Sequence, residues 1–235
     1  MAFSKREAPN CDWCPHRANC FFELLADKES RAAWKSIRLA NRFRPGEIIF
    51  YEGDKPGSVF VVCTGKVKIF RSSRTGQQLV TRIESPGDLC GHRPVLAGDT
   101  YYAGSGEAME ESIISMVDED VFKDFLMKHP RAALALLGAV AKDVRRGEDK
   151  ARDIAFKPAR SRLAATLLDL GQPLKGKRVV GGIKRKDLAE MSGLTIETTV
   201  RLLKDFEKRS LLRKQGKELI LTDEPNLRSV AERFN

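Results

Sequence analysis

The chain has 235 residues, 42% hydrophobic and 31% charged, with a formal net charge of +10. This length predicts one large domain or two smaller ones with an ordinary core, and the composition is that of a globular protein. The longest apolar run, 132–141, is about half a membrane span, and the charged N-terminus lacks the apolar segment of a signal peptide. We therefore expect a cytoplasmic protein without a membrane partner, in which the five cysteines are ligands or thiols rather than disulfides.

Positive charge is concentrated in the last third of the chain. Residues 157–235 contain 18 Lys or Arg against 10 Asp or Glu, whereas residues 1–156 are nearly neutral. A basic module beside a neutral one is typical of a polyanion-binding domain attached to a sensing or scaffold domain. The alternative is a basic surface that only keeps the protein soluble.

The N-terminal segment, 1–25, contains three cysteines with C-x2-C-x5-C spacing. They are Cys11, Cys14 and Cys20. Clustered thiolates in a reducing compartment bind soft metals, so the spacing indicates an iron–sulfur, zinc or copper(I) site, with redox thiols as the metal-free alternative. Three thiolates need a fourth ligand. Zinc could take His16, and an iron–sulfur cluster could take Cys63, Cys90 or a carboxylate.

Short β-rich runs follow a predicted helix over residues 26–40. Glycine-containing turns separate these runs, which cover 47–51, 58–63, 66–71, 78–84 and 112–117. Strands at such short and regular spacing predict a sandwich or small barrel.

A long helix is predicted over 130–155, because Pro130 suits a first helical turn and the apolar positions then recur in steps of three and four. The resulting seam consists of Leu134, Leu137, Ala141, Val144, Glu148 and Ala151. We expect it to pair with the same helix of a second copy, giving a homodimer. Packing against the chain's own β domain is the alternative. Glu148 would oppose its symmetry mate and weaken the dimer.

Two helices separated by a tight turn are predicted at 184–191 and 196–208. Ser192-Gly193 forms the turn, and Thr195 is a suitable N-cap for the second helix. One continuous face of that helix is expected to read base edges in double-stranded DNA. With its cap it comprises Thr195, Ile196, Glu197, Val200, Arg201 and Lys204. A hairpin over 211–221 would complete a winged helix-turn-helix, whereas the alternative is an ordinary helical hairpin with a solvated face.

These features together resemble the CRP/FNR superfamily of bacterial transcription regulators over Asn41–Leu221. The resemblance is carried by Arg44-Pro45-Gly46-Glu47, Gly53, Gly65-Lys66-Val67, Gly87-Asp88-Leu89 and the segment Leu194–Arg201. It implies an α+β fold with an N-terminal cyclic-nucleotide-binding-type β-roll, a long dimerisation helix and a C-terminal winged helix-turn-helix. The expected parts are a cysteine-rich arm (1–25), a sensor roll (26–128), the dimerisation helix (129–156) and a DNA-binding domain (157–235).

Within this superfamily the cyclic-AMP branch fits poorly. That branch has a ribose-binding Glu after the strand-end glycine, whereas here Gly91 is followed by His92. It also has a phosphate-binding Arg-Ser pair, where this chain has Tyr102 and Ala103. An anionic phosphate would lack its compensating charge, so we expect no cyclic AMP.

The FNR branch resembles the chain more closely, because its N-terminal cysteines have the same spacing and bind an oxygen-labile 4Fe–4S cluster. Its fourth cysteine corresponds to Ser115 here. We expect Cys90 to replace it, with Cys63 as second candidate and a carboxylate such as Asp118 or Glu111, or an external ligand, as third. Glu197 and Arg201 match the branch's recognition helix, whereas Val200 stands where the branch has Ser, which predicts a changed base preference there.

The expected function is that of a homodimeric transcription regulator, not an enzyme. It would sense oxygen, nitric oxide or redox state through the cluster and bind a pseudo-palindromic promoter site, with RNA polymerase as a further partner. The alternative is a roll that binds a small organic effector, with zinc or no metal at the cysteines. A cupin-type metalloenzyme would need several histidines in the roll, which contains only His92.

Overall fold

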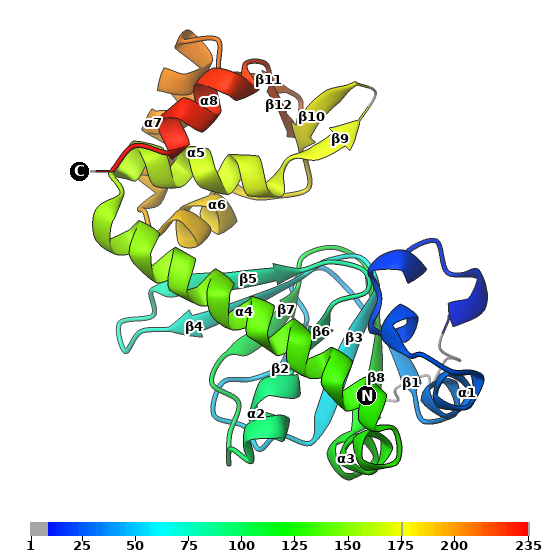
Figure 1. The fold of residues 1–235 in the computed structure, drawn as a ribbon. Coiled ribbons are helices and arrows are strands. Elements are labelled where there is room, and N and C mark those ends of the chain that lie inside the picture. Colours follow the sequence, from blue (N-terminus) through cyan, green and yellow to red (C-terminus); the bar gives the residue numbers. More distant parts are fainter. Residues whose placement is uncertain (1–8, 175, 235) are drawn as a thin grey trace. The chain divides into compact units, whose positions relative to one another are not determined.

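The computed structural model describes residues 9–174 and 176–234, which divide into two compact units. The N-terminal unit comprises Met1–Gln77 and Thr81–Val144, and the C-terminal unit comprises Gln78–Val80 and Arg145–Asn235. Figure 1 shows the elements of each unit. Residues 1–8 of the predicted arm, and Lys175 and Asn235 of the predicted DNA-binding domain, lie outside the described residues.

The N-terminal unit begins with short 3-10 turns and one helix. The turns are η1 (Cys11–Trp13), η2 (Arg17–Asn19) and η3 (Phe21–Leu24), and the helix is α1 (Lys28–Ser36). Asp27 caps α1 by accepting a hydrogen bond from the Ser30 backbone N–H at 2.7 Å. The helix predicted over 26–40 is therefore too long. Leu39 and Ala40 instead begin a strand, because they pair with Met116 and Ser115.

Two four-stranded sheets form the β-roll. One has the order β1-β8-β3-β6 and the other β2-β7-β4-β5. Their bounds are β1 Leu39–Phe43, β2 Ile48–Phe50, β3 Ser58–Thr64, β4 Val67–Ser72, β5 Gln78–Glu84, β6 Leu89–Cys90, β7 Ser105–Ala108 and β8 Ser112–Asp118. All five predicted strands are present, so the β-rich prediction is confirmed. The sequence did not predict β1, β6, β7 or the short helix α2 (His92–Ala97).

Helices α3 (Glu119–Lys128) and α4 (Pro130–Phe156) follow the roll. The long predicted helix is confirmed almost to the residue. Ala132 and Leu136 of α4 are buried among residues of the roll and of the N-terminal turns. Leu134 and Leu137, on another face of the same turns, expose 69% and 62% of their surface. The predicted seam is thus not covered within the N-terminal unit.

The C-terminal unit combines four helices of its own with a small sheet. These are α5 (Ala159–Leu170), α6 (Arg185–Ser192), α7 (Ile196–Lys208), α8 (Glu224–Ala231), β9 (Gln172–Leu174), β10 (Lys177–Val180), β11 (Leu212–Gln215) and β12 (Glu218–Leu221). The sheet order is β11-β12-β10-β9. Residues 172–174, for which no strand was predicted, pair with β10. Leu163, Leu188 and Phe206 lie in one fully buried cluster that joins α5, α6 and α7. The α+β fold class is confirmed, and no described helix is long and apolar enough to cross a membrane.

Candidate cysteine pocket and nucleic-acid interface

Four of the five cysteines line one pocket of the N-terminal unit. Cys11, Cys14 and Cys20 of the arm share it with Cys63 of strand β3. Arg38 forms a further part of its wall. The three predicted N-terminal ligands are therefore brought together on the roll, and Cys63 is the roll cysteine that joins them.

Glycine at position 87 lets the arm approach the roll. Gly87 has φ of +102°, and a Cβ there would lie 2.6 Å from the Asn19 carbonyl oxygen and 2.9 Å from the Cys20 Cα. Any other residue would clash with the segment that contains Cys20. The Gly87 carbonyl also accepts a hydrogen bond from the Phe21 backbone N–H at 3.4 Å. The Gly87 turn thus seats Cys20 against the roll.

Cys63 lies at an irregularity in strand β3. Val62 pairs with Ile114 and Thr64 with Ile113, so Cys63 is the extra residue of a β-bulge. A bulge redirects the side chain that it carries. The Cys63 thiol lies 3.9 Å from the Val61 carbonyl oxygen, a weak contact, and it also interacts with the backbone of Ser115. The thiol is therefore not engaged by a strong partner in the strand.

Burial keeps the pocket thiols protonated. It raises the pKa of Cys11 and of Cys20, and it raises the pKa of Cys63 to about 11. The positive charge of Arg38 opposes the shift at each of these thiols. In the free protein these groups are neutral, and a bound metal or cluster must displace their protons.

Arg38 is a buried cation that faces a pocket without a carboxylate. Its side chain lies in a residue that is 7% exposed, and one terminal N–H donates to the Pro9 carbonyl at 3.5 Å. The Nε atom of Arg38 is buried and has no hydrogen-bond partner among the described residues. A buried guanidinium is stabilised by a nearby anion. Thiolates around an iron–sulfur cluster would supply one, so the residues present fit such a group.

The pocket is not arranged as a closed single-ion site. Within residues 9–174 and 176–234, no three His, Cys, Asp or Glu side chains form a group that could hold one metal ion. A tetrahedral zinc site needs thiolates only roughly 3.8 Å apart, given its 2.3 Å bonds. A cluster places iron and sulfide between its ligands, so its thiolates stand further apart. Four cysteines line the pocket, which is the number of thiolates that a 4Fe–4S cluster takes.

The expectation that Cys90 supplies the fourth ligand is corrected by its position. Cys90 is fully buried in a different cluster, with Phe60 and Tyr102, and it does not line the cysteine pocket. Burial and the neighbouring Glu84 carboxyl raise its pKa far above the usual value. Strand β6 holds Cys90 against β3, where it pairs with Phe60. A Cβ at the neighbouring Gly91 would meet Phe60 and the Ser58 carbonyl oxygen of the roll, not the arm.

The two carboxylates considered as ligands are also placed elsewhere. Asp118 caps α3 by accepting hydrogen bonds from the backbone N–H groups of Asp120 and Val121. Glu111 pairs with Arg42 at 2.6 Å. Neither carboxylate lines the cysteine pocket, whereas His16, considered for zinc, does.

The positions compared with the cyclic-AMP branch are occupied by contacts of the protein itself. His92 is 3% exposed, and burial lowers its pKa to about 4. Its Nε2 atom lies 3.8 Å from the Oδ2 of Asp143, which also binds Arg82 at 2.9 Å. The Tyr102 hydroxyl donates to the Ser58 carbonyl at 2.8 Å. The residues at these positions thus fill the roll and tie it to α4.

Helix α7 presents the predicted base-reading face to solvent. Thr195 caps the helix by accepting from the Thr198 backbone N–H at 3.2 Å, and Gly193 makes the preceding turn with φ of +61°. The buried side is formed by Thr199, Leu202, Leu203 and Phe206. The opposite side lines a shallow depression of Ile196, Glu197, Val200, Arg201, Lys204, Asp205 and Lys208. Five predicted residues share it, with Thr195 at its head.

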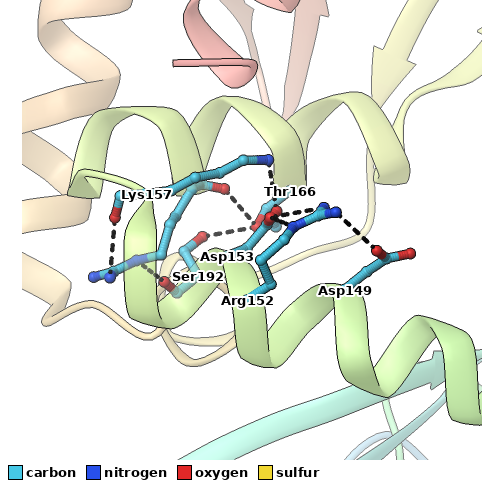
Figure 2. A network of polar contacts seen from close by, with 7 residues as sticks. Asp149, Arg152, Asp153, Lys157, Thr166 and Ser192 are labelled. Carbon is cyan, nitrogen blue, oxygen red and sulfur yellow. Dashed lines mark hydrogen bonds and ion pairs between the residues drawn. The ribbon is translucent and has the colours of Figure 1, made fainter. Parts of the chain in front are cut away.

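Arg162 connects the end of α4 to the turn before α7. Arg162 donates from Nε to the Ser192 carbonyl at 3.1 Å and from Nη2 to the Gly193 carbonyl at 3.3 Å. Its Nη1 donates to the Ile154 carbonyl of α4 at 3.1 Å. Figure 2 shows the surrounding network, in which Asp149, Arg152, Asp153 and Lys157 pair along α4 and Ser192 contacts Thr166. The recognition helix is therefore fixed to the end of the long helix.

Comparisons with known proteins match both halves of this architecture. The cyclic nucleotide-binding domain family matches residues 40–129, and the Crp-like helix-turn-helix domain family matches residues 161–230. The chain is similar to a CRP-like cAMP-activated global transcriptional regulator from Mycobacterium tuberculosis, 26% identical over 190 residues, 79% of this chain and 84% of that one. It is also similar to the fumarate and nitrate reduction regulatory protein of Vibrio cholerae, 23% identical over 229 residues, 95% and 91% of the two chains.

A solved structure, that of FixK2 from Bradyrhizobium japonicum, shares the fold with a TM-score of 0.76. The two are 22% identical, over 84% of this chain and 98% of that one. Roll, long helix and winged helix-turn-helix thus define a DNA-binding transcription regulator rather than an enzyme. The chain belongs to the CRP/FNR superfamily.

Proposed function

We propose that this regulator senses oxygen, nitric oxide or redox state through a 4Fe–4S cluster held by its N-terminal cysteines. The observation that carries the proposal is the shared pocket in which Cys11, Cys14 and Cys20 lie against the roll beside Arg38. The similarity to the fumarate and nitrate reduction regulatory protein supports a role in regulating reductions of this kind. The poor fit of His92 and Tyr102 to a nucleotide argues against cyclic AMP as the signal.

The cluster, when bound, supplies iron that reacts with oxygen or nitric oxide. The chain's own residues make such a group stable and controllable. Cys11, Cys14 and Cys20 hold it as thiolates, and Arg38 offsets part of the negative charge that those thiolates introduce. The remaining pocket wall is largely apolar, with Phe22 and Val61 among its residues, and it limits access of water.

The arm is packed into the same core as the start of α4, which gives the signal a route to the dimer. Cys11 and Phe22 belong to one buried cluster with Trp34 and, on α4, Ala132 and Leu136. Ligation at Cys11 would hold this cluster closed, and release of the arm would loosen the packing of α4. We propose that this shifts the pairing of the exposed seam in a homodimer. The seam is that of Leu134, Leu137, Ala141, Val144, Glu148 and Ala151.

The dimer would then bind a pseudo-palindromic promoter in the cytoplasm, with RNA polymerase as its further partner. Two copies of α7 would enter successive major grooves about 34–36 Å apart. Arg201 is placed to bind guanine, and Glu197 to accept from cytosine. Val200 offers a methyl-sized apolar contact to a thymine.

The test is anaerobic reconstitution of the purified chain with iron and sulfide. We expect about four iron and four sulfide ions per chain with a broad visible absorption, and loss of both in Cys14→Ser. A colourless protein with no bound iron would overturn the cluster. Zinc bound in proportion to the cysteines, or an organic effector that binds the roll, would then take its place.

A further inference from the structure

We propose that Cys63 supplies the fourth thiolate of the cluster, from a bulge of strand β3. This inference rests on the proposed function, since it names the ligand that the three N-terminal cysteines leave open. The position that the family resemblance assigns to the fourth cysteine is Ser115, on the neighbouring strand β8. The ligand would thus have moved from one strand of the sheet to the next.

Placement is the first argument. Cys63 lines the same pocket as the three arm cysteines, whereas Cys90, Asp118 and Glu111 do not. The strand register brings it there. Val61, two residues earlier, also lines the pocket. The bulge between Val62 and Thr64 redirects the Cys63 side chain relative to a regular strand.

Charge is the second argument. The Arg38 guanidinium acts on Cys11, Cys20 and Cys63 together, and it favours the thiolate form of each. The charged groups nearest to Cys90 include the Glu84 and Asp88 carboxylates, which oppose a thiolate, with Arg82 as the only opposing cation. Arg38 lines the pocket together with Cys63, so a cluster bound there would lie beside a cation.

The neighbouring strand provides a third argument. Ser115 pairs directly with Val61, and cross-strand partners project to the same face of a sheet. Its hydroxyl is buried and has no hydrogen-bond partner within the described chain. A hydroxyl is a poor ligand for iron beside thiolates. Cys63 lies next to this position, close enough for its thiol to bond the Ser115 backbone.

The experiment compares four proteins after anaerobic reconstitution: wild type, Cys63→Ser, Cys90→Ser and the double variant Cys63→Ser with Ser115→Cys. We expect Cys90→Ser to match the wild type in iron and sulfide. Cys63→Ser should lose one iron per cluster or about half of its total iron, and its electron paramagnetic resonance spectrum should change. The double variant should regain the wild-type content, because a thiol is restored on the same wall.

A measurement on the wild type alone covers the case in which Cys63→Ser does not fold. Iodoacetamide labelling, mapped by mass spectrometry, should modify Cys63 about tenfold more slowly in the loaded protein than in the cluster-free one. Full iron content and an unchanged spectrum in Cys63→Ser, or equal labelling of Cys63 in both states, would overturn this assignment. Failure of the wild type to bind iron and sulfide would instead overturn the proposed function itself.

Discussion

The cysteine pocket of the N-terminal unit and the recognition face of the C-terminal unit are opposite kinds of site. The pocket is largely buried, burial raises the pKa of the Cys11, Cys20 and Cys63 thiols, and the cation Arg38 has an unpartnered Nε within the described structure. The face on α7 is exposed, and Glu197 and Arg201 carry their charges in solvent. The face is complete as it stands, whereas the pocket needs an added group. In the proposed function, control belongs to the pocket and to the packing of α4, and helix α7 carries out the binding.

The largest effect is expected at the exposed seam of α4. Val144 is 55% exposed on the seam of α4. Val144→Glu would bury an unpaired charge against its own copy, so the variant should be monomeric by sedimentation and bind a full site about 100-fold more weakly. Glu148→Leu is the matched control and should strengthen the dimer. A dimeric Val144→Glu protein would show that this seam is not the interface.

The next effect tests the exposed face alone. Arg201→Ala should cost about 1–3 kcal/mol of binding free energy on the specific site and flatten the preference among bases. Lys204→Ala should weaken all DNA sequences about equally, since a lysine on the same face neutralises phosphates. Competition binding separates the two variants. An unchanged base preference in Arg201→Ala would mean that α7 does not read the DNA.

A smaller, pH-dependent effect tests how strongly the roll buries charge. Burial raises the pKa of the Glu84 carboxyl to about 7 from 4.5, partly opposed by Arg82. Between these pH values the unfolded chain releases a proton that the folded chain keeps, so wild-type stability falls as pH rises through this window.

Because Gln cannot ionise, the stability of Glu84→Gln relative to the wild type should increase by about 1 kcal/mol as the pH rises from 4.5 to 7. Chemical denaturation at pH 5 and pH 8 measures the difference. The titration of His92 is common to both proteins and cancels. The same stability difference at both pH values would contradict the assigned burial of Glu84.

The smallest effect concerns the cation of the pocket. Arg38→Met keeps an unbranched side chain and removes its charge, so the pKa of Cys63 should rise further above 11. Alkylation of Cys63 in the cluster-free protein at a fixed alkaline pH should slow about threefold. Arg93→Met removes a cation that binds Asp143 instead. This control should leave the rate at Cys63 unchanged, and equal slowing in both variants would reject a specific role for Arg38.

The C-terminal unit shows what local sequence signals can predict. The helices at 184–191 and 196–208 were predicted within a residue, because an N-cap at Thr195, a glycine at 193 and an apolar stripe all lie close together in sequence. The hairpin that follows has equally local signals. Strand β9 was not predicted, since Gln172–Leu174 is a short exposed segment that forms a strand by pairing with β10.

The cysteine pocket shows what such signals cannot predict. The spacing of Cys11, Cys14 and Cys20 identified three of its members, but the choice between Cys63 and Cys90 depended on tertiary structure. Cys63 ends a predicted β-rich run and Cys90 precedes a glycine, and neither has a local feature that marks a ligand. Cys63, and not Cys90, lies in the pocket because of the bulge in β3 and the approach of the arm over Gly87, neither of which local sequence signals reveal.

The central claim is that a cluster in the cysteine pocket controls specific DNA binding. It is tested most directly by the affinity of one anaerobically loaded sample for a pseudo-palindromic site, measured before and after its cluster is destroyed by air. Coupling of the usual 1–3 kcal/mol predicts a loss of about 5–150-fold, accompanied by dissociation of the dimer. The same affinity and the same dimer fraction in both states would contradict the account.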